Sequence, residues 1–314
     1  MNMTYGFTLA ALLAFAANSV LCRLALLATP NEDAAIDAMG FTLLRLVSGA
    51  VTLVLILWWR QRGAVSSFSS VAFVRSLNPF SRLHSRGHWL SGASLFVYAV
   101  CFSFAYVQLD TGVGALILFG TVQVCLVLLA LLNGHGLRKT EGVGLLLAFV
   151  GLLVLVWPSL NASALENSNL DLTGMLLMAC AGAGWALYSW QGKGASDALR
   201  ETTYSFVLSL LPLGLCALLY LAVYASFHVT REGIGLALAS GVLASGVGYA
   251  IWYQALRQLS AIQSATAMLL VPVLAALAGV VFLNEHLSGY FYVSCVLILC
   301  GVLLVTLAKQ PRRD

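Results

Sequence analysis

Residues 108–156 read QLDTGVGALILFGTVQVCLVLLALLNGHGLRKTEGVGLLLAFVGLLVLV, and this stretch has a counterpart later in the chain. Residues 258–305 read QLSAIQSATAMLLVPVLAALAGVVFLNEHLSGYFYVSCVLILCGVLLV and align with it in register, without a gap. Each copy holds two apolar runs long enough to cross a bilayer, separated by a short connector. The connector is NGHGL (133–137) in the first copy and LNEHL (283–287) in the second. An internal repeat of membrane-crossing segments therefore organises this sequence.

The composition of the whole chain agrees with a membrane protein. Hydrophobic residues make up 61% of the 314 residues and charged residues only 9%, whereas a soluble domain carries about 25% charged residues. A soluble enzyme and a nucleic-acid-binding protein are therefore excluded. The net charge of +4 matters less than where the basic residues lie.

Apolar runs separated by charged, Pro, Gly and Asn residues predict an all-α integral membrane protein with about ten transmembrane helices. The predicted spans are 5–28, 38–60, 88–107, 111–133, 140–157, 172–192, 202–226, 233–256, 260–283 and 288–308.

The basic residues predict the orientation of these spans. Thirteen of the 16 Lys and Arg residues flank one side, only Arg231 flanks the other, and Arg23 and Arg45 lie inside spans. Because basic loops stay in the cytoplasm, both termini are expected to be cytoplasmic. The thirteen are Arg60, Arg62, Arg75, Arg82, Arg86, Arg138, Lys139, Lys193, Arg200, Arg257, Lys309, Arg312 and Arg313.

The repeat predicts two halves of five spans each, residues 1–157 and 172–308. Residues 158–171 form an extracytoplasmic linker and residues 309–314 a basic cytoplasmic tail. Because five is odd, the second half enters the membrane inverted, which is the arrangement of many carriers that work by alternating access. Inverted repeats also occur in channels, so the repeat favours a carrier without proving one.

The two quoted stretches resemble tandem EamA domains of the drug/metabolite transporter superfamily. Pro272, the acidic connector at 284–287 and the glycine-led last span carry the resemblance. It implies ten helices, a central cavity and export of a small molecule across the bacterial inner membrane. The first copy departs from the pattern, with Val122 in place of the proline and His135 in place of the acid.

Polar residues inside spans are costly in lipid, so they are candidates for function. Arg45 shares a helical face with Thr42 and Ser48; it either attracts a substrate carboxylate or pairs with helix carbonyls or Asp37. Arg23 is expected to snorkel toward the outer headgroups. The amide of Asn18 either faces a cavity or bonds another helix.

Aromatic and amide side chains within the spans predict a cavity for an amphipathic solute, since Tyr and Trp combine an apolar face with a polar tip. For any single one of them packing is the favoured role, and for the set we expect some to line the cavity. With the two polar candidates above, the predicted substrate-binding set is Asn18, Arg45, Tyr98, Gln123, Trp185, Tyr188, Tyr249, Trp252 and Gln263.

The sequence contains no Walker A motif and no HExxH motif, so neither an ATPase nor a metalloenzyme is expected. The predicted function is secondary-active export of an amino acid or drug-like metabolite, with no cofactor and no nucleic-acid partner. The lipid bilayer and a small-molecule substrate are the expected partners, and a homodimer stays open. The alternatives are an exchanger of sugar phosphates or nucleotide sugars, and a passive facilitator or channel.

Overall fold

A computed structural model of the chain describes residues 3–28, 33–64, 86–134, 139–160, 172–192, 197–256, 258–259 and 267–308. Within these ranges the chain is helical, apart from short connections and one isolated antiparallel bridge between Ile36 and Val229. The elements are α1 (Met3–Leu26), α2 (Ala38–Ala64), α4 (Arg86–Tyr106), α5 (Thr111–Leu132), α6 (Lys139–Leu160), α7 (Leu172–Gly192), α8 (Ala198–Tyr224), α9 (Arg231–Ala239), η2 (Ser240–Val247), α10 (Gly248–Leu256), α12 (Leu270–Leu283) and α13 (Gly289–Ala308).

Seven helical rods in the described ranges are long and apolar enough to cross a bilayer, and two shorter apolar helices accompany them. The seven are Met3–Leu26, Ala38–Arg62, Trp89–Tyr106, Thr111–Leu132, Leu172–Gly192, Ala198–Tyr224 and Arg231–Ala255, and the two shorter ones are Leu270–Leu283 and Gly289–Leu304.

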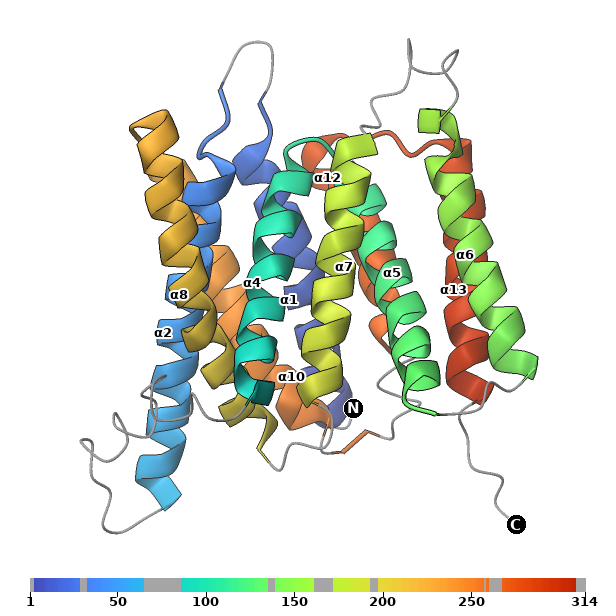
Figure 1. Cartoon of the computed structure of the whole chain (residues 1–314), viewed down its shortest axis with the longest axis horizontal. Coiled ribbons are helices and arrows are strands. Elements are labelled where there is room, and N and C mark those ends of the chain that lie inside the picture. The colour runs from blue at the N-terminus through green and yellow to red at the C-terminus, as the bar shows by residue number, and fades with distance from the viewer. Residues whose placement is uncertain are drawn as a thin grey trace.

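Figure 1 shows the helices side by side and roughly parallel to one axis, with α1 beginning and α13 ending at the same end of the bundle. Arg60, Lys139 and Arg200 belong to helix ends on that side, which we call the basic end. Asp37 and Asp110 immediately precede helices that begin at the opposite end, which we call the acidic end. The charge asymmetry of the sequence is thus an asymmetry between the two ends of the bundle.

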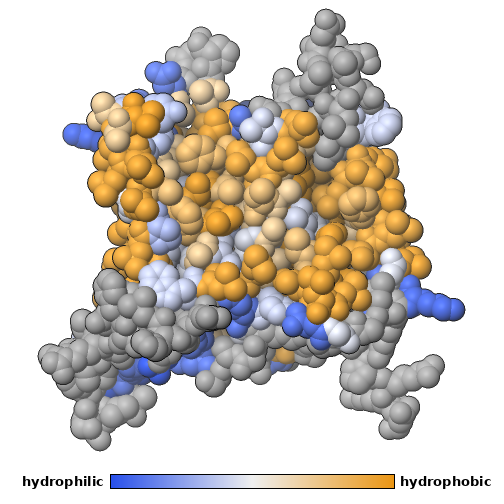
Figure 2. Space-filling view, viewed as in Figure 1, coloured by the Kyte–Doolittle hydropathy of each residue, from blue (hydrophilic) through white to orange (hydrophobic). Residues whose placement is uncertain are grey.

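The outer surface of the bundle matches a lipid environment. Figure 2 shows a broad hydrophobic band, with hydrophilic residues gathered toward its two ends. Large apolar side chains are exposed on several helices, including Leu55, Leu176, Leu218 and Val281. A soluble protein rarely exposes apolar surface on this scale. This surface and the long apolar helices are those of a membrane protein.

Helices α6 and α13 pack against each other at one edge of the bundle (Figure 1). Their contact depends on two glycines, because a Cβ atom at Gly301 would lie 2.5 Å from the Gly144 carbonyl oxygen. A Cβ atom at Gly151 would lie 2.7 Å from the Ile298 side chain. Small residues at such contacts let transmembrane helices approach closely.

The rod from Arg231 to Leu256 is interrupted by the π-helix η2, which the sequence analysis did not predict. Its sequence, SGVLASGV, consists largely of small residues. At Gly241 a Cβ atom would lie 2.4 Å from the Arg45 carbonyl oxygen, so η2 packs directly on the backbone of α2. π-Helical segments frequently occur at functional sites, which directs attention to the space beside Arg45.

Candidate substrate cavity

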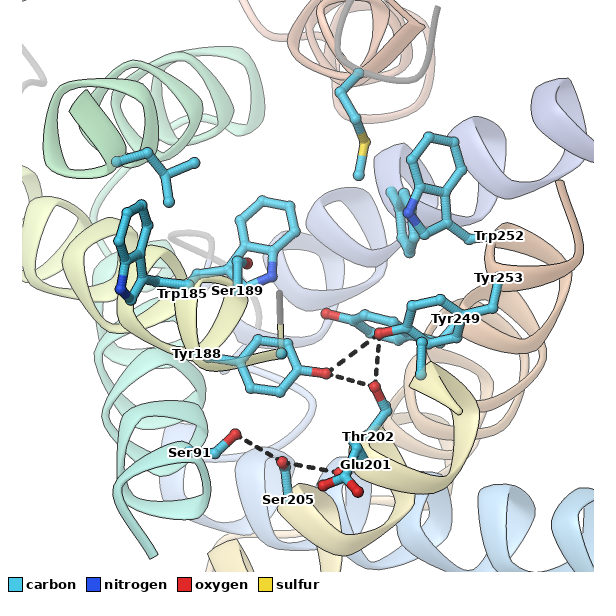
Figure 3. Close-up of a pocket in the computed structure, with 16 residues that line it drawn as sticks. Ser91, Trp185, Tyr188, Ser189, Glu201, Thr202, Ser205, Tyr249, Trp252 and Tyr253 are labelled. Carbon is cyan, nitrogen blue, oxygen red and sulfur yellow. Dashed lines mark hydrogen bonds between the residues drawn. The ribbon is translucent and has the colours of Figure 1, made fainter. Parts of the chain in front are cut away.

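A cavity of about 520 Å³ lies between α1, α4, α5, α7, α8 and α10, with Met268, just before α12, on its wall (Figure 3). Four of the predicted binding residues line it: Trp185, Tyr188, Tyr249 and Trp252. The other lining residues are Phe15, Ser91, Leu126, Ser189, Trp190, Gly192, Ala198, Glu201, Thr202, Ser205, Tyr253 and Met268. A volume of this size falls in the range of small-molecule sites.

Edge-to-face contacts between aromatic rings build the wall of the cavity. The ring of Phe15 lies 5.4 Å from that of Tyr249 and 6.0 Å from that of Trp252, centroid to centroid. The ring of Phe119 lies 5.2 Å from that of Trp185. These contacts join α1 to α10 and α5 to α7, and such pairs favour this relative orientation of the rings. The wall is therefore apolar and held in place by its own packing.

Hydroxyl groups from three helices meet on one side of the cavity (Figure 3). The Thr202 hydroxyl lies 2.6 Å from the Tyr188 hydroxyl and 2.6 Å from the Tyr253 hydroxyl. Nearby, the hydroxyls of Ser91 and Ser205 lie 2.8 Å apart. A solute in the cavity thus meets hydrogen-bonding groups on this side and aromatic faces on the other.

The cavity extends toward the basic end of the bundle. Its lining includes Gly192, the last residue of α7, and Ala198, the first residue of α8. Glu201, in the first turn of α8, is the one charged side chain among the described lining residues. The cavity wall thus carries no described Lys or Arg that would attract a multiply charged anion.

At the acidic end, backbone contacts hold together the connection before α2 and the connection before α9. Ile36 and Val229 form the β-bridge, and the Thr230 N–H donates to the Ala35 carbonyl at 2.9 Å. The Asp37 carboxylate accepts hydrogen bonds from the His228 N–H at 2.7 Å and, with its other oxygen, from the Gly40 N–H at 2.7 Å. Asp37 is therefore committed to this contact and is not the partner of Arg45.

Beyond the cavity lies a small space of about 20 Å³, which we call the deep recess. It shares Phe15, Trp185 and Tyr249 with the cavity and adds Asn18 and Tyr98 among others. Both alternatives for the Asn18 amide apply, because Asn18 lines the recess and its carbonyl oxygen also accepts a hydrogen bond from the Ser240 hydroxyl at 2.6 Å. This bond ties α1 to the start of η2.

Arg45 lies next to the deep recess and is 2% exposed. One terminal nitrogen, Nη2, donates to the Tyr98 hydroxyl at 3.1 Å, and the guanidinium carbon lies 4.7 Å from the ring centroid of Phe102. Nε and Nη1 have no hydrogen-bond partner among the described residues. Thr42 and Ser48 are buried on the same face, so the predicted face does point into the protein.

Arg23 does not snorkel to the headgroups, and that expectation is wrong. It is 8% exposed, and its Nη1 donates to the carbonyls of Tyr106 and Val107, both at 2.9 Å. Carboxylates of Asp110 and Glu285 lie 3.5 and 4.0 Å from other guanidinium nitrogens. The C-terminal carbonyls of α4 and two acids attract the guanidinium inward more strongly than headgroups attract it outward.

Glu285, in the connector between α12 and α13, binds the start of α5. Its carboxylate accepts hydrogen bonds from the Thr111 N–H at 2.8 Å and from the Thr111 hydroxyl at 2.7 Å. Burial raises the pKa of Glu285, although these hydrogen bonds and Arg23 oppose the rise. Burial also raises the pKa of Asp110, against the effect of Arg23. This cluster connects the two repeated stretches, residues 108–156 and 258–305.

The remaining predicted residues lie elsewhere. Gln123 lines an adjoining crevice of about 200 Å³, which shares Leu126, Trp185, Ser189 and Met268 with the cavity. Gln263 lies outside the described residues. The predicted binding set contains no residue of α8, although Thr202 and Ser205 line the cavity. Single Thr and Ser residues are common in helices and did not indicate a binding site. Their three-residue spacing on one helical face was the available signal.

Comparison with known proteins identifies the family. The EamA-like transporter family matches residues 172–307. The uncharacterised protein PA1977 of Pseudomonas aeruginosa is 44% identical over 309 residues, which are 98% of this chain and 96% of that protein. A protein of known crystal structure covers 99% of both chains with a TM-score of 0.61 at 19% identity, which supports the fold alone.

Two more distant relatives have more informative names. A probable amino-acid metabolite efflux pump of Salmonella typhimurium is 26% identical over 215 residues, 65% of this chain and 70% of that protein. The threonine/homoserine exporter RhtA of Salmonella typhimurium is 29% identical over 186 residues, 56% of this chain and 58% of that protein. With its helical bundle and aromatic cavity, this chain is a membrane protein of the EamA-like transporter family, in the drug/metabolite transporter superfamily.

Proposed function

We propose that this protein is a secondary-active exporter of a small amphipathic metabolite, an amino acid or a drug-like compound, at the bacterial inner membrane. The observation that carries the proposal is the cavity of about 520 Å³, lined by aromatic rings and hydroxyl groups in the interior of an apolar bundle. The names of the efflux pump and of RhtA agree with this cargo.

The proposal includes alternating access by ten transmembrane helices arranged as two inverted repeats, residues 1–157 and 172–308. The basic end faces the cytoplasm in this arrangement, as the distribution of Lys and Arg favours. The cavity extends toward that end, while Ile36, Asp37 and Val229 close the other. These features are those of an exporter in the state that accepts its solute from the cytoplasm.

An exchanger of sugar phosphates or nucleotide sugars is a weaker candidate. Such cargoes carry two or more negative charges and need basic groups around them. Among the described lining residues of the cavity the charged one is Glu201, an acid. A neutral, zwitterionic or singly charged solute fits this lining better.

Counterflow in proteoliposomes tests the function directly. Purified protein is reconstituted, loaded with one unlabelled amino acid or metabolite at a time, and assayed for uptake of the labelled compound with and without a pH gradient. Saturable exchange that competitors inhibit is expected for one chemical class. Flux that does not saturate would instead support a facilitator or channel, and no flux from folded protein would remove the proposal.

The orientation has a separate test. A single cysteine introduced between residues 65 and 85, in a variant without the native cysteines, should resist an impermeant thiol reagent in intact cells. The same cysteine should react after the membrane is permeabilised. Labelling in intact cells would place the basic end outside and reverse the proposed direction.

A further inference from the structure

We propose that Arg45 binds the carboxylate of the transported solute, and that Tyr98 holds the guanidinium until the carboxylate replaces it. This inference rests on the proposed function, because it requires that a solute enters the cavity. It narrows the cargo from small amphipathic metabolites to compounds that carry one carboxylate on an apolar or aromatic body.

The first argument is the charge on Arg45. The side chain is 2% exposed, and none of the carboxylates that form ion pairs among the described residues pairs with it. Tyr98 supplies one neutral hydrogen bond, and Nε and Nη1 have no partner in the described part of the chain. A buried charge without a counterion is costly. Binding of an anion would supply both the missing charge and the missing acceptors.

The second argument is position. The guanidinium carbon lies 5.3 Å from the ring centroid of Tyr98 and 4.7 Å from that of Phe102, and both rings line the deep recess. The recess in turn shares Trp185 and Tyr249 with the cavity. The side chain of Tyr98 therefore stands between the guanidinium and the space that a solute can enter.

The third argument concerns the size of the recess and the order of events. A space of about 20 Å³ holds about one water molecule and no solute, so the carboxylate reaches Arg45 only when Tyr98 turns away. Arg45 is the eighth residue of α2, roughly 10 Å from the helix start at the acidic end. A solute that moves from the cavity to Arg45 has thus moved toward the closed end, the direction of export.

The exchange of partners also favours selectivity. A carboxylate on a guanidinium makes shorter and stronger hydrogen bonds than a phenol does. An uncharged analogue would only replace one neutral partner of Arg45 with another. A solute with several negative charges would leave most of them unpaired, because Arg45 offers one positive charge through its contact with Tyr98 of the recess.

Competition between matched pairs of compounds tests the proposal. Counterflow of a labelled aromatic amino acid is measured against the same amino acid and its amide, and against an aromatic monocarboxylate and the corresponding alcohol. In the natural protein each acid should compete roughly ten- to a hundredfold better than its uncharged partner, as expected for a charge-assisted hydrogen bond. In the Arg45→Met variant the difference should vanish.

Arg200→Met is the matched control, because Arg200 also pairs with a tyrosine, donating to the Tyr204 hydroxyl at 3.3 Å, but does not line the cavity or recess. It should keep the preference for acids. Ligand-induced shifts of thermal unfolding, measured in detergent on the same proteins, provide a readout that needs no transport. The acids should raise the unfolding temperature of the natural protein and of Arg200→Met, but not that of Arg45→Met.

The outcomes separate this inference from the function. If the amides and the alcohol compete as well as the acids, transport stands and the role of Arg45 is refuted. If no compound exchanges, the proposed function fails, and Arg45 keeps its role only if the acids still shift unfolding through it. Each assay is repeated with sulfate in place of chloride. Loss of transport of every compound without chloride would assign Arg45 to an inorganic anion and overturn the proposal.

Discussion

Arg23 and Arg45 are buried arginines on adjacent helices, α1 and α2, but their surroundings differ. Arg23 donates to two backbone carbonyls and has two carboxylates within 4.0 Å. Arg45 has a phenol, an aromatic face and two nitrogens without a partner among the described residues. The partners of Arg23 indicate a residue that stabilises the contact between helix ends. Arg45 has guanidinium nitrogens without a described partner, and these can donate to an anion.

Burial alone therefore does not identify a functional charge. Arg23 and Arg45 are 8% and 2% exposed, so exposure does not distinguish them, whereas the partners of each guanidinium do. Evolution tolerates an uncompensated charge in lipid chiefly where function requires it. The comparison therefore predicts opposite effects when each arginine is removed.

The largest expected effect is loss of stability in Arg23→Met. The substitution leaves the buried carboxylate of Glu285 without its cation and two carbonyls without their donor, which costs about 3–5 kcal/mol. Thermal unfolding in detergent should show a large decrease for Arg23→Met. Arg45→Met, the matched variant, should unfold at or above the temperature of the natural protein. Equal losses in the two variants would make Arg45 a structural residue as well.

A smaller effect is expected for Tyr98→Phe, which removes the hydroxyl partner of Arg45 and keeps the ring. The guanidinium then loses its one described hydrogen bond, which should lower stability by about 1–3 kcal/mol. A bound monocarboxylate should recover more stability in this variant than in the natural protein, because no hydroxyl has to be displaced. Tyr106→Phe is the control, since its hydroxyl donates to the Thr111 carbonyl at 3.3 Å and also bonds Ser19, but does not bond Arg45. A carboxylate-induced shift unchanged by Tyr98→Phe would contradict the exchange of partners.

Asp110→Asn should have a still smaller effect. The Asp110 side chain is 31% exposed and lies 3.5 Å from Arg23, and a solvent-screened ion pair contributes about 0–1 kcal/mol. The carbonyl bonds and Glu285 should keep Arg23 in place. A loss of stability as large as that of Arg23→Met would show that Asp110, rather than the helix end, holds the guanidinium.

Sequence reasoning predicted much of this fold because the fold follows from composition and periodicity. Apolar runs of membrane length become helices in any lipid-exposed chain, so the helix ranges agreed to within a few residues for most spans. The π-helix η2 was missed because its small residues suit an α-helix equally well. The close contact between Gly241 and α2 joins segments far apart in the chain, which no local pattern reveals.

The cavity was harder to predict, because its geometry also depends on contacts between segments that are far apart in the chain. Trp185, Tyr188, Tyr249 and Trp252 were found because aromatic residues are conspicuous inside spans. The fate of Arg23 depends on Glu285, which is more than 250 residues away in the chain, so its partners could not be read from its neighbours. The sequence identified Arg45 as a candidate, but the geometry was needed to show that Nε and Nη1 have no hydrogen-bond partner among the described residues.

The finest distinction between the two arginines is their dependence on pH. Burial raises the pKa of Glu285 beside Arg23 above its usual value of 4.5, so the folded protein holds this proton more tightly than the unfolded chain does. The resulting stabilisation is complete below pH 4.5 and is lost as the pH rises through the raised pKa. Glu285→Gln cannot ionise, so its unfolding temperature should fall less between pH 4 and pH 7. Arg45→Met should retain the full pH dependence of the natural protein, because no titrating partner of Arg45 has been removed.

The contradicting outcome is an unfolding temperature that falls equally with pH in Glu285→Gln and in the natural protein. The pKa of this carboxyl group would then be the same in the folded and unfolded chains, and Arg23 and Arg45 would differ in their hydrogen-bond partners alone.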